Sequence, residues 1–324
     1  MEVRNTNQRS MRVKLIFNPV SGANSESPIQ LMDIIKQLQA WNLVPEPYLT
    51  EPASDLRKVI NDAISQGIKM IIVCGGDGTV SAAARAIIGT TAILGIIPTG
   101  TQNNVAMSLG IPTAIPDAIA LLRTGRRFKI DIGICNYNGE ATPFIEVCSV
   151  GLFSTLFSSA DDIQHGKLSQ VGNFITTLAA TPPSEIHLQL ENKKEIHELG
   201  HLVIVSNMPY IVRHYQVGSA DSLTDGLLDV LFFADLSKLD LINYLIKGPG
   251  TSKNEDPRIQ HFRVRSITIK TNPAMPIMID GISIGDGTVR LEAKRRGMTV
   301  MAAREVSDKL VETVDMITGD LIGK

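Results

Sequence analysis

The chain has 324 residues, of which 44% are hydrophobic and 20% are charged, and its formal net charge is −2. This composition is typical of a globular protein with a large core, excludes an intrinsically disordered chain, and at this length favours two domains. The nearly balanced charge gives no indication of a nucleic-acid partner.

The first 126 residues alternate between short apolar runs and segments with helical spacing. Strands are expected at 12–18, 43–50, 69–73 and 92–98, and helices from about residue 29 and at 56–64, 81–88, 105–109 and 117–123. This alternation predicts a parallel α/β sheet, in which ligands bind at the carboxyl ends of the strands. The loops that begin at Asn18, Gly75 and Thr99 each follow an expected strand, so we expect them to meet at one edge.

One of these loops, Gly75-Gly76-Asp77-Gly78-Thr79, joins an apolar strand to an Ala-rich helix. Its glycines let backbone N–H groups approach a ligand, and the start of a helix favours an anion. It matches neither the P-loop nor the G-x-G-x-x-G pattern, and by itself it fits a tight βα turn equally well. The convergence of three loops favours the anion site.

After about residue 128 the pattern changes to short strand-like segments bounded by turn residues. They lie at 129–135, 144–150, 186–190, 202–206, 227–233, 264–270, 276–279, 288–292 and 298–301, which predicts an antiparallel β domain. Helical segments at 154–164 and 169–180 either pack against this sheet or line an apolar substrate slot. We therefore expect domains at 11–128 and 129–304, followed by an amphipathic helix at 305–324 whose acidic polar face favours docking on protein over anionic lipid.

Five motifs follow one another along the chain. They are Asn18-Pro19-x-Ser21-Gly22, Gly75-Gly76-Asp77-Gly78-Thr79, Pro98-x-Gly100-Thr101-x-Asn103-Asn104, Asp225-Gly226-Leu227-Leu228-Asp229-Val230 and Asp280-Gly281. With these motifs in this order, the chain resembles the bacterial lipid kinase family related to diacylglycerol and sphingosine kinases. The resemblance implies an N-terminal α/β domain of phosphofructokinase or NAD kinase type, a C-terminal antiparallel β-sandwich, and ATP bound in the cleft between them.

The resemblance also implies roles for individual residues. Asn18 and Gly22 would line the nucleotide pocket, Gly75, Gly76, Gly78 and Thr79 would hold the phosphates, and Gly100, Thr101 and Asn103 would close the site. Asp280 would be the general base toward the lipid hydroxyl, with Asp77 as a second catalytic carboxylate. Asp225 and the carbonyls of Ser222 and Leu227 would hold a structural Mg²⁺. Phosphoryl transfer needs such positioning and charge neutralisation more than covalent catalysis.

The chain departs from the family at several acidic positions. Ser81 and Ala82 stand in place of Asn-Glu, Asn104 in place of Asp, and Ile282 in place of Glu. Because losing negative charge near ATP weakens metal coordination, three interpretations stay open. They are an ATP-dependent kinase of a diacylglycerol-like or long-chain lipid, a non-catalytic nucleotide- or lipid-binding protein, and an NAD kinase-like enzyme, which the missing Asn-Glu pair and the apolar segment 156–178 disfavour.

The expected partners are a lipid substrate and, transiently, a membrane surface, with a homodimer left open. The polar first ten residues are unlike a signal peptide, and no apolar run is long enough to span a bilayer. Three cysteines form neither a metal-binding spacing nor a disulfide framework, which favours a cytoplasmic setting. The six histidines are scattered without a metalloprotease motif. The strand carrying His261, Arg263 and Arg265 either faces an anionic head group or is solvated, and Asp286 is expected in a hairpin turn.

Overall fold

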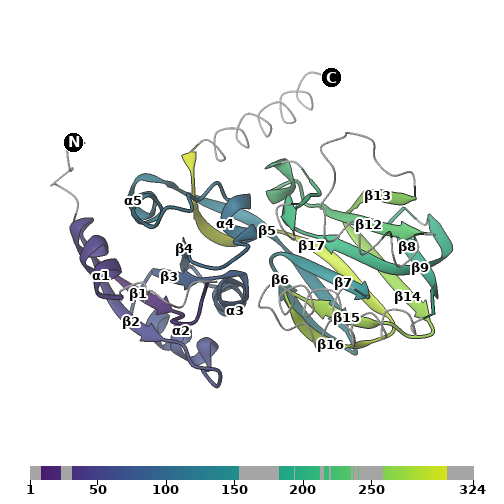
Figure 1. Cartoon of the computed structure of the whole chain (residues 1–324), viewed down its shortest axis with the longest axis horizontal. Coiled ribbons are helices and arrows are strands. Elements are labelled where there is room, and N and C mark those ends of the chain that lie inside the picture. Colours follow the sequence, from purple (N-terminus) through teal and green to yellow (C-terminus); the bar gives the residue numbers. More distant parts are fainter. Residues whose placement is uncertain are drawn as a thin grey trace. The chain divides into compact units, whose positions relative to one another are not determined.

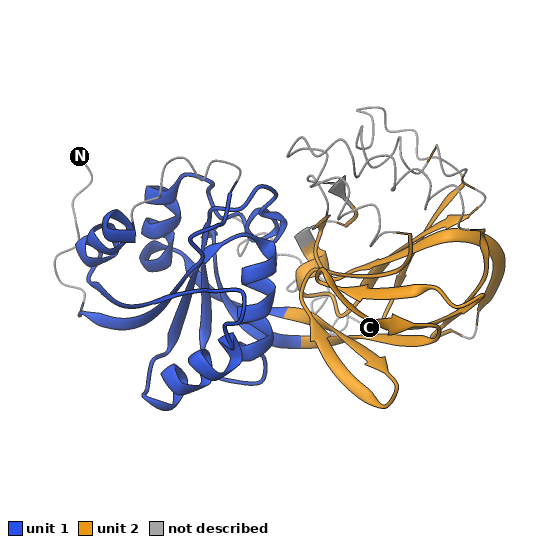
Figure 2. Ribbon diagram, turned by 60° about the horizontal axis from the view of Figure 1, so that its bottom comes forward, with its two compact units in different colours: residues 1–130, 296–324 blue, residues 131–295 orange. Residues whose placement is uncertain are grey.

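The computed structural model describes residues 9–22, 31–152, 182–192, 194–211, 215–218, 220–234, 236, 240 and 258–304. The chain divides into two compact units, one formed by residues 1–130 with 296–324 and the other by residues 131–295 (Figure 2). The helices expected at 154–164, 169–180 and 305–324 lie outside the described residues. No helix in the described part of the chain is long and apolar enough to cross a bilayer.

The first unit alternates strands and helices, as the sequence pattern predicts (Figure 1). Its elements are β1 (Met11–Phe17), α1 (Leu31–Ala40), β2 (Leu43–Leu49), α2 (Leu56–Ser65), β3 (Met70–Gly75), α3 (Asp77–Ile87), β4 (Ile93–Pro98), α4 (Asn104–Ser108) and α5 (Ile115–Thr124). Local capping agrees with this assignment: the Asp55 carboxylate accepts the Lys58 N–H at 3.0 Å to begin α2, and Gly67 with φ +85° follows its end.

The sheet of the first unit is parallel. β1 lies between β2 and β3, and β4 follows β3. Every residue of β3 and β4 is buried, as expected for strands covered on both faces. Helix α2 contacts α3, and α1 contacts α5, which gives one helix pair for each face. The predicted parallel α/β domain is confirmed.

Strand β17 (Val289–Ala302) passes from the second unit into the first. Its early residues pair antiparallel with β14 (Ser266–Asn272), whereas Thr299 and Val300 pair parallel with Ile93 and Leu94 of β4. The predicted boundary at 128/129 lies close to the division at 130/131. Residues 296–304, in contrast, belong to the first unit and not to the contiguous second domain that the sequence pattern indicates.

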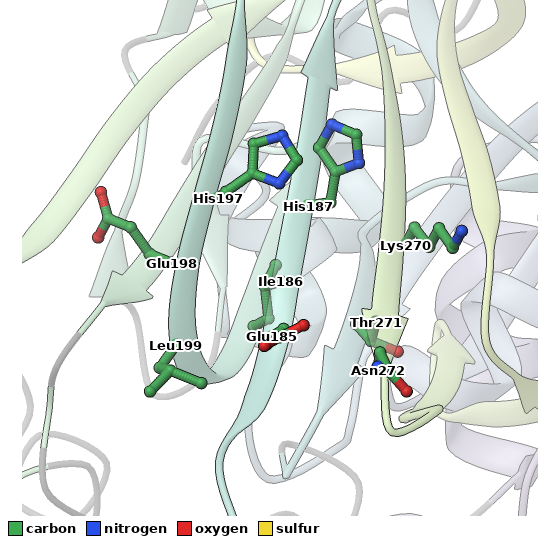
Figure 3. A pocket seen from close by; sticks show the side chains of 9 residues that line it. All are labelled: Glu185, Ile186, His187, His197, Glu198, Leu199, Lys270, Thr271 and Asn272. Carbon is green, nitrogen blue, oxygen red and sulfur yellow. The ribbon is translucent and has the colours of Figure 1, made fainter.

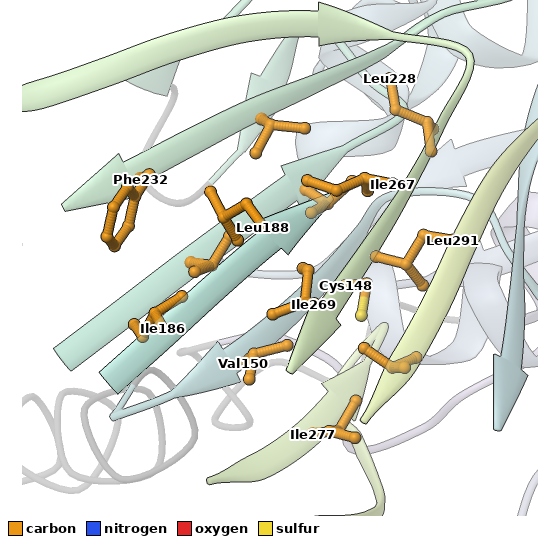
Figure 4. Close-up of a cluster of buried hydrophobic side chains, with 14 of the residues drawn as sticks. Cys148, Val150, Ile186, Leu188, Leu228, Phe232, Ile267, Ile269, Ile277 and Leu291 are labelled. Atoms are coloured by element: carbon orange, nitrogen blue, oxygen red, sulfur yellow. The ribbon is translucent and has the colours of Figure 1, made fainter. Parts of the chain in front are cut away.

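The second unit is built almost entirely from antiparallel strands, as predicted. Besides β14 it contains β5 (Arg126–Tyr137, which starts in the first unit), β6 (Glu140–Phe144), β7 (Val147–Gly151), β8 (Ser184–Leu190), β9 (Glu195–Ser206), β10 (Tyr210–Ile211), β11 (Tyr215–Gln216), the 3₁₀ turn η1 (Ala220–Leu223), β12 (Leu228–Ala234), β13 (Ile259–Val264), β15 (Pro276–Ile279) and β16 (Ile282–Asp286). Alternate residues of these strands build a buried apolar cluster that includes Leu188 and Phe232 (Figure 4), and a second cluster includes Leu202 and Phe233. The unit is the predicted β-sandwich-type domain.

Four predicted strands are divided or merged in the structure. The segment 144–150 is divided between β6 and β7, because the N–H groups of Ile145 and Glu146 bond a side-chain carboxylate instead of a neighbouring strand. The segment 264–270 belongs to β13 and β14, and the segments 288–292 and 298–301 form the single strand β17.

Candidate functional site

The three predicted loops of the first unit leave the same edge of its parallel sheet. They follow β1, β3 and β4, which are neighbours in the sheet. Backbone hydrogen bonds connect them at the strand ends: Asn18 N–H donates to the Cys74 carbonyl at 2.9 Å, and Thr99 N–H donates to the Gly75 carbonyl at 3.2 Å. The expected convergence of the loops is therefore present.

The side chain of Asn18 orders two of these loops. Its Nδ2 donates to Thr79 Oγ1 at 2.9 Å, and its Oδ1 accepts the Val20 N–H at 3.1 Å. The first contact holds the β1 loop against the first turn of α3, and the second shapes the loop itself. Asn18 is thus a positioning residue within this unit.

Glycines allow the loops to approach each other closely. A Cβ on Gly100 would lie 2.4 Å from Gly76 Cα, and a Cβ on Gly76 would lie 3.1 Å from Gly100 Cα. Gly22, with φ +103°, lies so near Thr99 that a Cβ would be 2.7 Å from the Thr99 carbonyl oxygen. Backbone packing alone therefore requires glycine at positions 22 and 100, whereas at Gly76 a Cβ would be only a tight contact.

Gly78 differs from these glycines. It lies in the first turn of α3, is exposed, and a Cβ built on it would meet nothing within 4 Å among the described residues. Glycine in a helix is less stable than alanine by up to about 1 kcal/mol, so packing gives no reason for its presence. The N-cap residue of α3 is Gly76, which has no side chain to cap the first N–H groups of the helix. An approaching anion would meet the start of α3 without a side chain at either position.

Two polar residues complete the edge. Asn103, with φ +56°, accepts the Gly100 N–H at 2.9 Å and donates to the Gly100 carbonyl at 2.7 Å. Asp77 Oδ1 accepts the Val105 N–H at 3.1 Å and so caps α4 from another element. The structure therefore gives Asp77 a positioning contact that the sequence pattern does not reveal. Thr101 is exposed.

Asp280 of the second unit is buried in the turn between β15 and β16. Its Oδ1 accepts the N–H groups of Glu146 and Val147 at 2.9 and 3.1 Å, and its Oδ2 accepts that of Ile145 at 2.9 Å. Asp280 and Gly281 both have positive φ, as a tight two-residue turn requires. These three donors fix the orientation of the carboxylate.

The predicted metal ligands lie in a charged cluster of the second unit. Asp225 Oδ1 accepts the Leu227 N–H at 2.7 Å, while its Oδ2 contacts the Arg263 guanidinium. Ser222 Oγ donates to Asp229 Oδ2 at 2.9 Å, and His261 Nε2 lies 2.9 Å from Asp229 Oδ1. His261, Arg263 and Arg265 are all exposed, in agreement with the solvated strand face, and the first two also contact carboxylates.

This cluster does not fit a Mg²⁺ on Asp225 while Arg263 is in place. Mg²⁺ requires a near-octahedral set of oxygen ligands, and here one oxygen already contacts a cation and the other an N–H group. Burial raises the pKa of Asp225 above its ordinary value, opposed by the Leu227 N–H and the Arg263 charge. The carbonyls of Ser222 and Leu227 as metal ligands stay a prediction.

Two further residues of the second unit order this region without having been predicted. Asp131 Oδ2 accepts the Gly226 N–H at 2.7 Å, and Asn207 Nδ2 donates to the carbonyls of Asp131 and Ile145 at 3.1 and 3.0 Å. The available signal was Asp131 itself, a lone acid between Ile130 and Ile132 in an apolar strand. Buried polar residues of this kind are nearly always hydrogen-bonded.

The three cysteines are buried and are not positioned to react as thiolates. Cys74, Cys135 and Cys148 are all buried, and burial raises the pKa of Cys74 to about 12. A thiol with such a pKa carries almost no thiolate at neutral pH, so Cys74 is not a nucleophile.

The residues that replace family acids lie in unlike environments. Ser81 and Asn104 are buried near the starts of α3 and α4, and Ala82 is half-buried. Ile282 is 48% exposed in β16. Asp286 ends β16 and pairs with Pro276 of β15. Because β16 does not pair with β17 in the described part of the sheet, the turn after Asp286 is not the expected hairpin turn.

Comparison with known proteins gives matches over both units. Residues 12–135 match the diacylglycerol kinase catalytic domain, and residues 147–302 match the YegS C-terminal NAD kinase beta sandwich-like domain. A diacylglycerol kinase of Mycobacterium tuberculosis is 30% identical over 241 residues, covering 71% of this chain and 75% of that protein. An uncharacterized protein of Synechocystis is 28% identical over 311 residues, covering 90% of this chain and 70% of that protein. The crystal structure of a diacylglycerol kinase from Bacillus anthracis has the same fold, with a TM-score of 0.68 and 21% identity, covering 92% of this chain and 99% of that chain.

Proposed function

Because the chain belongs to the bacterial lipid kinase family that includes the diacylglycerol kinases, we propose that it transfers the γ-phosphate of ATP to a hydroxyl group of a lipid. The observation that carries the proposal is the set of three glycine-containing loops at one edge of the parallel sheet. Diacylglycerol-like and long-chain lipids are the proposed acceptors, and the enzyme is proposed to visit the membrane surface from the cytoplasm to meet them.

In this proposal the first unit binds ATP through backbone groups. The start of α3, at Gly76 to Thr79, receives the phosphates, because its N–H groups point along the helix axis toward an anion and Gly78 keeps the approach open. Asn18, Gly22, Gly100, Thr101 and Asn103 surround the nucleotide. Mg²⁺ arriving with ATP would neutralise part of the phosphate charge.

Asp280 is proposed as the general base. Its three N–H donors would hold the carboxylate still, and the carboxylate would take the proton of the lipid hydroxyl as the hydroxyl oxygen attacks the γ-phosphorus and ADP leaves. Asp77 is proposed to act mainly by holding α4 beside the phosphates, since its Oδ1 caps that helix.

The second candidate is a nucleotide- or lipid-binding protein without turnover. It is favoured by the engagement of both candidate carboxylates, Asp77 and Asp280, in backbone hydrogen bonds. Ala82, Asn104 and Ile282 in place of family acids support the same alternative.

A lipid-panel assay separates the two candidates. Purified protein is incubated with [γ-³²P]ATP, Mg²⁺ and mixed micelles of single lipids, with NAD as an additional acceptor, and products are identified chromatographically. Labelled phospholipid that disappears in Asp280→Asn, with ATP binding retained by calorimetry, supports the kinase. ATP binding without a labelled product from any lipid supports the second candidate, and labelled NADP supports the NAD kinase-like interpretation.

A further inference from the structure

The tripeptide Glu-Ile-His occurs twice in the second unit, at 185–187 in β8 and at 195–197 in β9. The two strands are antiparallel neighbours in which His187 is directly opposite His197. Ile186 and Ile196 are buried in the core, so strand alternation turns both histidines to the other face of the sheet. Glu195, two residues before His197, lies on that same face.

The ligand atoms of these three side chains lie close to one another. Glu195 Oε2 lies 3.7 Å from the Nε2 atoms of both His187 and His197, and one ligand atom of each residue lies within 4.8 Å of the other two. Ligands of a tetrahedral Zn²⁺ are about 3.3 Å apart, given metal–ligand distances of about 2.0 Å. The two carboxylate–imidazole distances exceed this spacing by about 0.4 Å, and rotation of one ring would bring the three ligand atoms toward one ion.

The Nε2 atom of His187 indicates that a ligand is missing. It is shielded from solvent and has no hydrogen-bond partner among the described residues, and Glu195 is too distant to serve as one. A shielded polar atom of this kind is costly unless water or an ion completes it. The imidazoles stack with centroids 3.8 Å apart, and the 64% exposure of the His197 side chain leaves it room to rotate toward a shared ion.

We propose that His187, Glu195 and His197 form a binding site for a transition-metal ion of the Zn²⁺ class. Two imidazoles with one carboxylate suit Zn²⁺, Co²⁺, Ni²⁺ or Cu²⁺, whereas Mg²⁺ and Ca²⁺ prefer oxygen ligands alone. Three protein ligands leave at least one coordination position for water or another ligand. Binding requires one ring to turn out of the stack, because parallel rings direct their lone pairs alongside each other.

The charges around the site favour a cation over an anion. The two histidines line a pocket of about 730 Å³ that crosses β9, β8 and β14 (Figure 3). Its charged lining residues are Glu185, Glu198 and Lys270, and Glu195 adds a further negative charge. The excess of carboxylates repels phosphate groups and attracts a metal ion. Lys270, which pairs with His187 across β8 and β14, is the one positively charged residue among these lining residues.

The test is calorimetric titration of the full chain, free of any histidine tag, with ZnCl₂ in a buffer without ATP or Mg²⁺. We expect one equivalent to bind, and Co²⁺ to give the visible absorption bands of a tetrahedral site. His187→Ala, His197→Ala and Glu195→Gln should each weaken binding by about tenfold or more, because each removes one of three ligands. The double variant His187→Ala/His197→Ala should show no specific binding.

Glu198→Gln is the matched control. It removes a carboxylate from the same strand and pocket. Glu198, however, accepts a hydrogen bond from Gln260 Nε2 at 2.9 Å and follows His197 directly, so strand alternation places it on the opposite face of β9. Its Zn²⁺ affinity should stay within about twofold of the wild type. All variants are compared in EDTA by circular dichroism, so that a folding defect is separated from a lost ligand.

Three outcomes would overturn the proposal. They are less than half an equivalent of Zn²⁺ at saturation, equal weakening by Glu195→Gln and Glu198→Gln, and undiminished Zn²⁺ binding by the folded double variant. Because no arm contains ATP or lipid, the result is independent of kinase activity.

Discussion

Replacing Gly100 by alanine should separate the loops that follow β3 and β4. The added Cβ would lie 2.4 Å from Gly76 Cα, whereas ordinary contacts begin at 3.4 Å, so the two backbones must move apart by about 1 Å. Backbone atoms cannot rotate away as a side chain can, and such overpacking costs about 1–3 kcal/mol. We expect the free energy of unfolding of Gly100→Ala to fall by that amount.

Two other glycines of the same site provide an internal scale. A Cβ on Gly76 would lie 3.1 Å from Gly100 Cα, only about 0.3 Å inside ordinary contact, so Gly76→Ala should cost less than Gly100→Ala. Gly78→Ala meets nothing within 4 Å and replaces a helical glycine, so its stability should stay level or rise by up to about 1 kcal/mol.

Urea denaturation and ATP calorimetry on the three variants measure different consequences. Gly100→Ala should lose stability and ATP affinity together, because the loop positions change. Gly78→Ala should lose ATP affinity while remaining stable, because its methyl group would stand where the phosphates are proposed to approach the helix. A Gly100→Ala variant as stable as the wild type, or a Gly78→Ala variant destabilised as much as Gly100→Ala, would contradict the close packing of these two loops.

Three other predictions concern ionisable groups that are buried or half-buried. Asp280→Asn should lower the free energy of unfolding by about 1–3 kcal/mol, because an amide cannot accept from both sides and one of the three N–H groups loses its partner; unchanged urea denaturation would contradict the described contacts. The raised pKa of Asp225 means that the folded chain holds this proton more tightly than the unfolded chain, so its contribution to stability is lost as pH rises from the ordinary value through the raised one. Asp225→Asn should therefore flatten the dependence of unfolding free energy on pH in that acidic range, and an unaltered profile in urea melts at a series of pH values would speak against it. Cys74, Cys135 and Cys148 should react with a thiol reagent at pH 8 only after denaturation, and rapid release of chromophore from native protein would show that a thiol is accessible.

The parallel sheet and its ligand edge could be predicted because both depend on local patterns. Apolar runs followed by glycine loops identify β1, β3 and β4, and the carboxyl ends of adjacent parallel strands share an edge by geometry. The resemblance identifies Asp280 and Asp77, but their partners could not be read from the sequence. Asp280 bonds backbone groups 133 to 135 positions away, and any N–H group is a suitable donor, so no residue type marks them. Similarly, the proposed metal-binding group of His187, Glu195 and His197 depends on strand register, which places His187 opposite His197.

The pairing of β17 with β4 has a consequence for the order in which the first unit assembles. Ile93 and its partner Thr299 lie 206 positions apart, the difference between 299 and 93. At synthesis rates of about 5–20 residues per second, β4 waits roughly 10–40 s for this neighbour. During that time β4, whose residues are all buried in the finished sheet, has one unpaired edge, to which another strand can add. The second unit is translated within this interval, so β4 keeps an unpaired edge until residues 299 and 300 have been synthesised.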